Sequence, residues 1–257
     1  MTKWTSIAGD DVAASVGAGF RSVEGQASSR QLSPDNFSLW LVETDLSDAA
    51  TLSWSAHDSD DAVFVLNGEL DVEGRSCPAG GAVIVERGAR VTATAKGSTS
   101  VAHFGSRSHV LAPPGPLHAP GPGGRVHVVG PAGRFESGAR ENVSAVWFAD
   151  GTCDSCRVQL FTVETPVSDD RRGRPHSHSQ DEIIYLIDGA VSMGTYTFGP
   201  GTAVSIPADV RYALTAQDGG HRFLNFRRDV SWQIYELGSE PIIETAVARG
   251  GRPTDDA

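Results

Sequence analysis

The sequence lacks several features that mark common classes of protein. No apolar run among its 257 residues approaches the roughly 20 residues that cross a bilayer. The first twenty residues lack the basic start and the compact apolar segment of an export signal. Lys and Arg number 21 against 32 Asp and Glu, and the net charge of −11 repels nucleic-acid phosphates. These absences predict a cytoplasmic protein that binds neither nucleic acid nor membranes.

Cysteines and familiar catalytic fingerprints are also scarce. Cys153 and Cys156 form a C-x-x-C, and the third cysteine, Cys77, is far from them in the sequence. A C-x-x-C can be redox-active or supply half of a zinc site, but no second C-x-x-C and no βαβ pattern accompany this one. We interpret the pair as small residues in a turn before a strand, with reversible oxidation to a disulfide left open. The sequence shows no G-x-S-x-G, P-loop or dinucleotide-binding fingerprint.

Helical periodicity is nearly absent, and short apolar runs separated by Gly, Pro, Asp and Ser take its place. Many short strands with frequent turn signals are typical of an all-β sandwich or barrel. Residues 112–125, "APPGPLHAPGPGGR", are too rich in Pro and Gly for the interior of a sheet. We therefore predict an N-terminal domain at 1–111, a linker at 112–125, a C-terminal domain at 126–247 and a flexible tail at 248–257.

The two halves of the sequence resemble each other. The stretch that begins "HDSDDAVFVLNG" aligns without a gap with the one that begins "HSQDEIIYLIDG". This alignment places Asp61 on Glu182, Gly68 on Gly189 and Gly80 on Gly201. Turn glycines and apolar runs match together, which favours an internal duplication. Each half is then one β-domain of the same fold.

The second copy carries a group of side chains that bind metals. Residues i and i+2 of a strand point to the same side, so His176 and His178 can aim their rings at one centre. Glu182 has the same parity but would lie about 13 Å beyond His178 on a straight strand, at roughly 3.3 Å per residue. Ser179, Gln180 and Asp181 favour a bend that would return the Glu182 carboxylate to the centre.

Two imidazoles and one carboxylate suit a divalent first-row metal with open coordination positions. This set is typical of Fe(II) oxygenases, and Mn, Zn, Ni and Co also accept it. Open positions allow the metal to bind oxygen or polarise a substrate. We expect one divalent metal ion on His176, His178 and Glu182, with Fe(II) favoured.

These residues resemble a known family. "HSHSQDEIIYLIDG" is similar to the first motif of the cupin superfamily, and "GTAVSIPADVRYALTA" is similar to the second. Because the match covers most of both halves, the chain resembles a bicupin. The resemblance implies two tandem jelly-roll β-barrels, with a metal held inside the barrel by the motif residues.

The sequence departs from the family pattern at several positions. Tyr212 stands where the family has its third histidine, and we expect it to ligate the metal, to act as an acid or base beside it, or merely to fill the barrel. The first copy keeps less of the pattern, with Ser55, Asp61 and Val91 at the ligand positions. We interpret this half as structural, with His57 and Asp61 as a residual polar pair.

Three further residues are candidates for substrate binding. Gln159 and Asn225 lie on strands expected to line the second barrel. Arg174 belongs to an arginine cluster before His176 that could recognise a carboxylate, although such a run is more often a solvated loop.

The function remains open between three alternatives at this stage. The first is an Fe(II)-type oxygenase or dioxygenase that acts on a small oxygenated molecule. The second is a metal-dependent isomerase, lyase or decarboxylase with Tyr212 as acid or base, and the third is a non-enzymatic small-molecule-binding cupin. A homodimer is expected, because partners often cover the edges of jelly-roll sheets.

Overall fold

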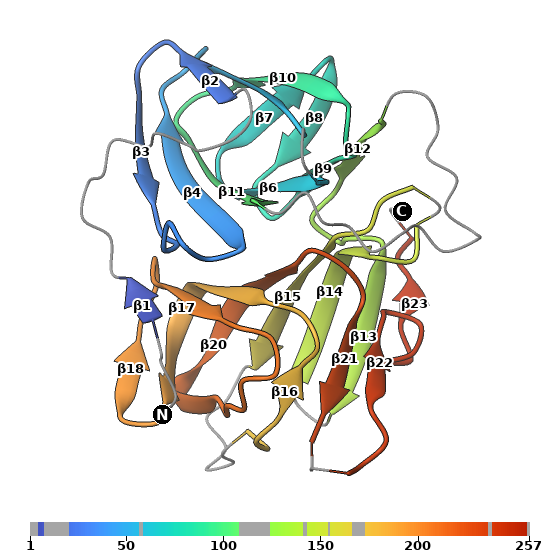
Figure 1. Cartoon of the computed structure of the whole chain (residues 1–257). Helices are drawn as coiled ribbons and strands as arrows, with labels where there is room; N and C mark the ends of the chain where they lie inside the picture. Colours follow the sequence, from blue (N-terminus) through green and yellow to red (C-terminus); the bar gives the residue numbers. More distant parts are fainter. Residues whose placement is uncertain are drawn as a thin grey trace.

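We describe the fold from a computed structural model, which covers residues 5–7, 21–56, 59–107, 124–140, 143–153, 155–165, 173–235 and 238–255. Regular structure in these residues consists of antiparallel strands, which confirms the all-β prediction. None of these residues belongs to a helix that could cross a membrane. The strands form two domains, one above the other in Figure 1.

The first domain is built from two sheets. The six-stranded sheet has the order β12-β9-β6-β11-β4-β3, and the five-stranded sheet has the order β2-β5-β10-β7-β8. Apolar side chains on the facing sides of the sheets form its core, which includes Leu52, Val65 and Val83. The bounds of its strands are β2 Arg21–Glu24, β3 Ala27–Gln31, β4 Leu39–Leu46, β5 Thr51–Ser55, β6 Asp61–Asn67, β7 Glu69–Val72, β8 Arg75–Pro78, β9 Ala82–Val85, β10 Arg90–Ala95, β11 Thr99–Ser106 and β12 Val126–Val129.

The second domain has one large and one small sheet. The large sheet has the order β1-β19-β17-β20-β15-β14-β13-β23, with β18 also paired to β17, and the small sheet has the order β16-β21-β22. Their bounds are β1 Thr5–Ile7, β13 Phe135–Arg140, β14 Val143–Asp150, β15 Gln159–Thr165, β16 Ser177–His178, β17 Glu182–Met193, β18 Tyr196–Phe198, β19 Ala203–Ile206, β20 Thr215–Arg227, β21 Ser231–Ile234, β22 Ile242–Glu244 and β23 Arg252–Pro253.

Strand pairing crosses the predicted domain boundaries. β1, from the first residues of the chain, pairs with β19 in the second domain, whereas β12, which follows the predicted linker, pairs with β9 in the first (Figure 1). The tail expected to be flexible is attached at β23, which pairs with β13, and Thr254 donates a backbone hydrogen bond to the Arg134 carbonyl. Of the predicted linker, only residues 124 and 125 lie among those described.

The internal repeat is visible in the strand register. Asp61 pairs with Val85 between β6 and β9, and Glu182 pairs with Ile206 between β17 and β19. Gly68 and Gly189 end the corresponding runs, with φ of 78° and 69°. An added Cβ would meet backbone atoms at 2.4 Å and 2.1 Å at these two glycines, so both close approach and positive φ require glycine there.

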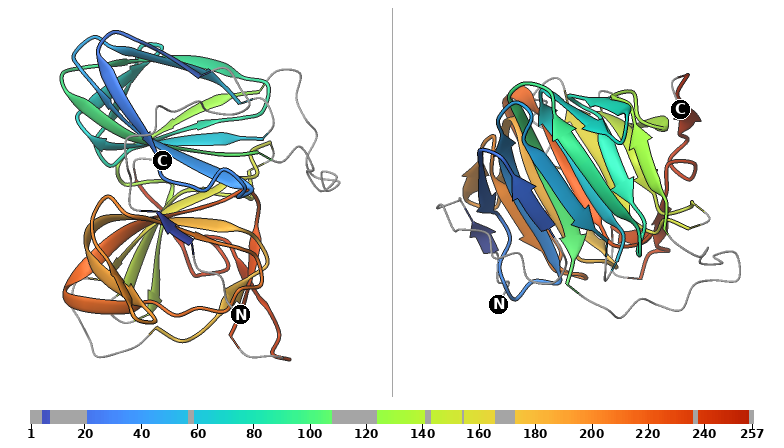
Figure 2. Two further views of the ribbon diagram at one scale, coloured as in Figure 1. Left: turned by 60° about the vertical axis from the view of Figure 1, so that its left-hand side comes forward. Right: turned by 90° about the horizontal axis from the view of Figure 1, so that it is seen from above.

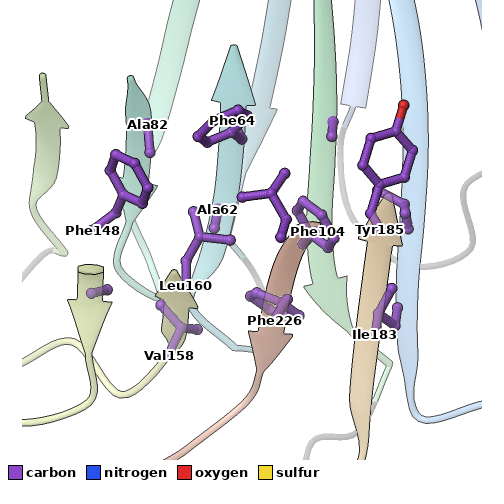
Figure 3. Packing of buried hydrophobic residues seen from close by; sticks show 14 of the residues in the cluster. Ala62, Phe64, Ala82, Phe104, Phe148, Val158, Leu160, Ile183, Tyr185 and Phe226 are labelled. Carbon is purple, nitrogen blue, oxygen red and sulfur yellow. The ribbon is translucent and has the colours of Figure 1, made fainter. Parts of the chain in front are cut away.

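The two domains pack through their largest sheets. Apolar side chains of the six-stranded sheet face those of the nine-stranded sheet, and together they form one buried cluster (Figure 3). Phe104 of β11 stacks on Phe226 of β20 with ring centroids 5.2 Å apart, and Phe64 meets Phe148 edge-on at 5.4 Å. Two further views show the sheets lying between the bodies of the two barrels (Figure 2). Because one side of the nine-stranded sheet packs in this shared core, its other side faces the interior of the second barrel.

Candidate active site

The predicted bend brings His178 and Glu182 together. Residues 179 and 180 bend the chain after β16, and Glu182 is the first residue of β17. The His178 Nε2 atom lies 3.7 Å from Glu182 Oε1. Both side chains are buried, with 3% and 1% of their surface exposed. Charged groups buried this deeply are costly unless they are paired, so their partners define the site.

Arg227 occupies the centre of the site. It lies directly opposite Glu182 in the pairing of β17 with β20 and is 2% exposed. Its Nη2 atom is 2.9 Å from Glu182 Oε2 and 3.2 Å from His178 Nε2. A fixed positive charge therefore lies next to two of the predicted metal ligands.

Glu244 of β22 completes the buried charge network. Its Oε2 atom lies 2.6 Å from His178 Nδ1 and 2.7 Å from Arg227 Nη1, and its Oε1 lies 2.5 Å from Arg249 Nη2. The small sheet thus contributes a second buried carboxylate that orients the His178 ring. Such a carboxylate behind a histidine fixes the ring tautomer and its orientation.

The carboxyl groups of Glu182 and Glu244 stay ionised because each lies next to the positive charge of Arg227. Burial alone would raise the pKa of Glu182, but the neighbouring His178 and Arg227 outweigh it and lower the pKa to about 2. Burial likewise opposes the charged form of Glu244, yet Arg227 and His178 hold the pKa of this carboxyl well below its usual range. The two carboxylates in turn raise the pKa of Arg227 despite its burial.

Tyr212 projects its hydroxyl into this network. Its backbone exchanges two hydrogen bonds of 2.9 Å with His176, which anchors the turn after Pro207 to the strand end that carries the histidines. The Tyr212 hydroxyl lies 3.2 Å from His178 Nε2. Burial and the neighbouring Glu182 raise the pKa of the phenol well above 10. Tyr212 is therefore protonated at neutral pH and available as a proton donor.

His176 lies nearer the surface than His178. The two ring centroids are 4.9 Å apart, and the His176 ring also contacts Tyr212 and Tyr235. Burial and the adjacent His178 lower the pKa of His176 to about 4, so this imidazole is neutral at pH 7. The exposed Arg174 lies with its guanidinium carbon 5.0 Å from the centre of the Tyr235 ring. His176, Tyr235 and Arg174 therefore form an outer group. Arg174 lies outside the buried network.

Gln159 and Asn225 both lie in the barrel interior. Asn225 Nδ2 donates a 2.8 Å hydrogen bond to Glu182 Oε2. Gln159 Oε1 lies 3.4 Å from Arg227 Nη1, and its amide nitrogen donates to the Glu244 backbone carbonyl. Their described contacts are with the charged residues, which indicates that they position the network.

The donor chemistry of the site fits a divalent cation. His176 Nδ1 lies 2.8 Å from the Arg174 carbonyl and His178 Nδ1 lies against Glu244, so each Nδ1 is assigned the proton and each Nε2 keeps its lone pair. Glu182 Oε1 is buried without a hydrogen-bond partner. The geometry is not that of a closed metal site, because His176, His178 and Glu182, all among the described residues, do not bring three donor atoms within 4.8 Å of one another. Arg227 already contacts the Glu182 carboxylate that the ion would need.

Sequence reasoning missed Arg227 and Glu244. Arg227 could have been found by parity, because it lies two residues after Asn225 on one strand and points to the same side. Glu244 had no comparable signal, since it comes from a short strand outside both motifs. In the first copy, Asp61 lies 3.8 Å from His103, whereas His57 falls outside the described residues.

Several solved structures are similar to this chain in fold. No family model and no curated protein sequence matches the chain. Among solved structures, oxalate decarboxylase from Lactobacillus farciminis, crystallised as a formate complex, is 14% identical with a TM-score of 0.63, covering 84% of this chain and 86% of that one. The DUF861 protein YlbA from Escherichia coli is 12% identical with a TM-score of 0.61, covering 78% and 82%.

Oxalate decarboxylase from Bacillus subtilis is a third neighbour. It is 16% identical with a TM-score of 0.58 and covers 82% of this chain and 75% of that one. Another structure of this enzyme is described through its Mn(II) centres. Identities this low establish shared architecture alone. The chain shares the all-β, jelly-roll architecture of these proteins, as the sequence motifs predicted.

Proposed function

We propose that this chain is a non-oxidative cupin enzyme, a lyase, decarboxylase or isomerase that acts on a small oxygenated molecule in its C-terminal barrel. The observation that carries the proposal is the Tyr212 hydroxyl, which lies 3.2 Å from His178 Nε2 inside a fully buried charge network. The raised pKa keeps this phenol protonated at neutral pH, so its hydroxyl can donate a hydrogen bond to negative charge that develops beside it. Two neighbours described as oxalate decarboxylases make non-oxidative chemistry the closest analogy.

In this proposal His176, His178 and Glu182 would hold one divalent metal ion. When bound, the ion would act as a Lewis acid that polarises a substrate oxygen. Mn(II) is supported by analogy with the Bacillus subtilis enzyme, and Fe, Zn, Ni and Co accept the same donors. The Fe(II) oxygenase expected from the ligand set draws no such support from the neighbours.

The other roles belong to the chain's own residues. Glu244 keeps the His178 ring in one orientation through the 2.6 Å contact at Nδ1. Tyr212 delivers a proton to the reacting atom, and the charge of Arg227 stabilises negative charge that develops beside it. Arg174, at the outer end of the site, would orient a carboxylate group of an incoming molecule.

A second candidate function is a metal-free acid–base or anion-binding site. It is favoured by the guanidinium of Arg227, which contacts Glu182 and Glu244 and lies 3.2 Å from His178 Nε2. In this alternative Arg227 supplies the positive charge that the ion supplies in the first. The two candidates share Tyr212 and differ in their need for a metal.

Metal analysis and turnover assays separate these candidates. We would measure metal content and turnover of a panel of C2–C4 mono- and dicarboxylates, oxalate included, with and without oxygen. Tyr212→Phe is expected to lower kcat by about 10²- to 10⁴-fold with little change in KM, because it removes a proton donor and keeps the ring. The matched control is Tyr196→Phe, since this side chain lies on β18 and is 60% exposed, outside the buried network.

The results of these assays distinguish the two candidate functions and can contradict the proposal. Turnover that continues without oxygen and falls in Tyr212→Phe supports the proposal. Metal that is present in the wild type and lost in His178→Gln selects the metal-dependent form, whereas turnover by metal-free protein selects the second candidate. Turnover that requires oxygen, or that is equal in Tyr212→Phe and Tyr196→Phe, contradicts the proposal.

A further inference from the structure

A second group of possible metal ligands lies at the seam between the two domains. Glu86 follows β9, and His127 lies on β12, which pairs with β9. Cys153 comes from the segment after β14 of the second domain. One donor atom from each side chain lies within 4.8 Å of the other two, and His127 Nε2 is 2.8 Å from Glu86 Oε1. Three segments distant in sequence thus converge on one point.

We propose that Glu86, His127 and Cys153 form a zinc-binding site that joins the two domains. A carboxylate, an imidazole and a thiolate are the three donor types that zinc uses in proteins. In the described part of the chain, this is the one set of His, Cys, Asp and Glu side chains in which three donor atoms meet so closely. The site is separate from the network around His178, because none of its residues belongs to that network.

The hydrogen bonds around Cys153 and Glu86 favour the deprotonated forms of these two side chains. A hydrogen bond from the Cys156 thiol and backbone N–H groups of Ser155 and Cys156 lower the pKa of Cys153 to about 4, although partial burial opposes this. Burial would raise the pKa of Glu86, but hydrogen bonds from Ser155 and His127 outweigh it and lower the pKa. A cation at this point would take the place of the proton that His127 Nε2 shares with Glu86 Oε1.

The present partners of Glu86 can give way to an ion. Arg125 Nε lies 3.4 Å from Glu86 Oε1, and the Arg125 side chain is 61% exposed, so it can turn into solvent. The Ser155 hydroxyl also donates to Glu86 Oε1. The Arg125 backbone N–H donates to Oε2 at 3.0 Å and can remain in place to orient the carboxylate. The site thus has a supporting hydrogen bond beyond its ligands, as metal sites usually do.

A cavity adjoins the cysteine ligand. It has a volume of about 310 Å³ and is lined in part by Cys153, Cys156, Asp150 and Arg134. Three protein ligands leave one position of a tetrahedral zinc ion open. Because Cys153 borders the cavity, we place the open position on that side, where water or a small anion beside Arg134 would reach the ion.

Zinc and cobalt provide direct probes of this site. We would equilibrate the purified full chain with Zn²⁺, remove free metal, and measure zinc content and the melting temperature. Zinc is expected to raise the melting temperature of the wild type, because an ion that binds only the folded state stabilises it and here joins two domains. Co²⁺ in place of zinc is expected to give a thiolate-to-cobalt charge-transfer band, which requires a cysteine ligand.

Variants assign the effects to the proposed ligands. Cys153→Ser and His127→Gln are expected to lose the charge-transfer band or the bound zinc together with the rise in melting temperature. His178→Gln is the matched control for metal bound in the barrel, and it should keep the band. Cys77→Ala is the control for an unrelated cysteine, since Cys77 is buried in the core of the first domain.

Two results would overturn the zinc site. One is a wild-type cobalt spectrum without a sulfur-to-metal band, or a band that persists in Cys153→Ser. The other is a Cys153–Cys156 disulfide in the purified protein that, once reduced, leaves a chain that takes up no zinc beyond the amount held by Cys153→Ser.

Discussion

The interiors of the two barrels are filled in opposite ways at the same place in the fold. In the second barrel β15, β20 and β17 place Gln159 beside Arg227 and Arg227 beside Glu182. In the first barrel β4 and β11 pair Trp40 with Gly105, and an added Cβ at Gly105 would lie 2.3 Å from the Trp40 ring and 2.6 Å from Asp61 Oδ1. A tryptophan ring therefore takes the volume that the guanidinium takes in the other barrel.

The residues around His103 show the same difference between the two barrels. This buried histidine lies between the rings of Trp40 and Trp54, with centroids 4.7 Å and 5.2 Å away. In the second barrel the corresponding place on β20 carries Asn225, which donates to Glu182. The same arrangement of strands can thus enclose aromatic rings packed around a histidine or a network of charges.

The largest effect is expected from removing the central charge. Arg227→Met should destabilise the protein by about 3–5 kcal/mol, because it leaves Glu182 and Glu244 buried without their cation. Urea unfolding at pH 7 would measure the loss. Arg228→Met, at the next position and half-buried, is the control and should stay within about 0.5 kcal/mol. Similar losses in the two variants would show that the charge network does not stabilise the second barrel.

A smaller effect is expected from adding volume to the first barrel. Gly105→Ala should cost about 1–3 kcal/mol, because the new methyl group overlaps the Trp40 ring in a closely packed interior. Gly138→Ala is the control, since nothing lies within 4 Å of the Cβ it would add. Thermal unfolding of both variants would test this, and a neutral Gly105→Ala would mean that the first barrel has free space after all.

The smallest expected effect is a difference in pH dependence. Burial and the charge of Arg21 hold the pKa of His103 well below 6.5, so the folded protein keeps this imidazole neutral while the unfolded chain protonates it. Stability from this group is complete above pH 6.5 and is lost as the pH falls, by at most about 2 kcal/mol between pH 6.5 and 5. The groups that face the ring are Arg21, Asp61, Trp40 and Trp54.

His103→Gln should remove this part of the pH dependence, because the amide does not titrate. Chemical unfolding of wild type and variant at pH 7, 6 and 5 would show the difference. Parallel stability curves would contradict a neutral buried His103.

Periodicity in the sequence predicted the all-β fold, and spacing predicted that His178 and Glu182 would lie close together. Short apolar runs and turn glycines were sufficient to predict an all-β chain, because alternation and positive φ are local properties. His178 and Glu182 were brought together as expected, because Ser179 and Gln180 form the bend. Arg227 and Glu244 were not foreseen, since the burial of a charge depends on partners from distant strands. The sequence also did not predict which strands β1 and β12 pair with, because a segment of three or four residues carries no signal for its partner strand.

The pairing of β1 and β12 with strands of the other half of the chain makes the two halves difficult to separate. β12 follows the Pro/Gly-rich segment in the chain but pairs with β9 in the domain that precedes that segment, and β1 pairs with β19 across the same divide. A protease that cut between residues 108 and 123 would separate each of these strands from the fragment that holds its partner. The two pieces would remain associated through strand pairing and the shared aromatic core, and either half expressed alone would present an unpaired sheet edge. We therefore expect the two barrels to behave as a single folding unit.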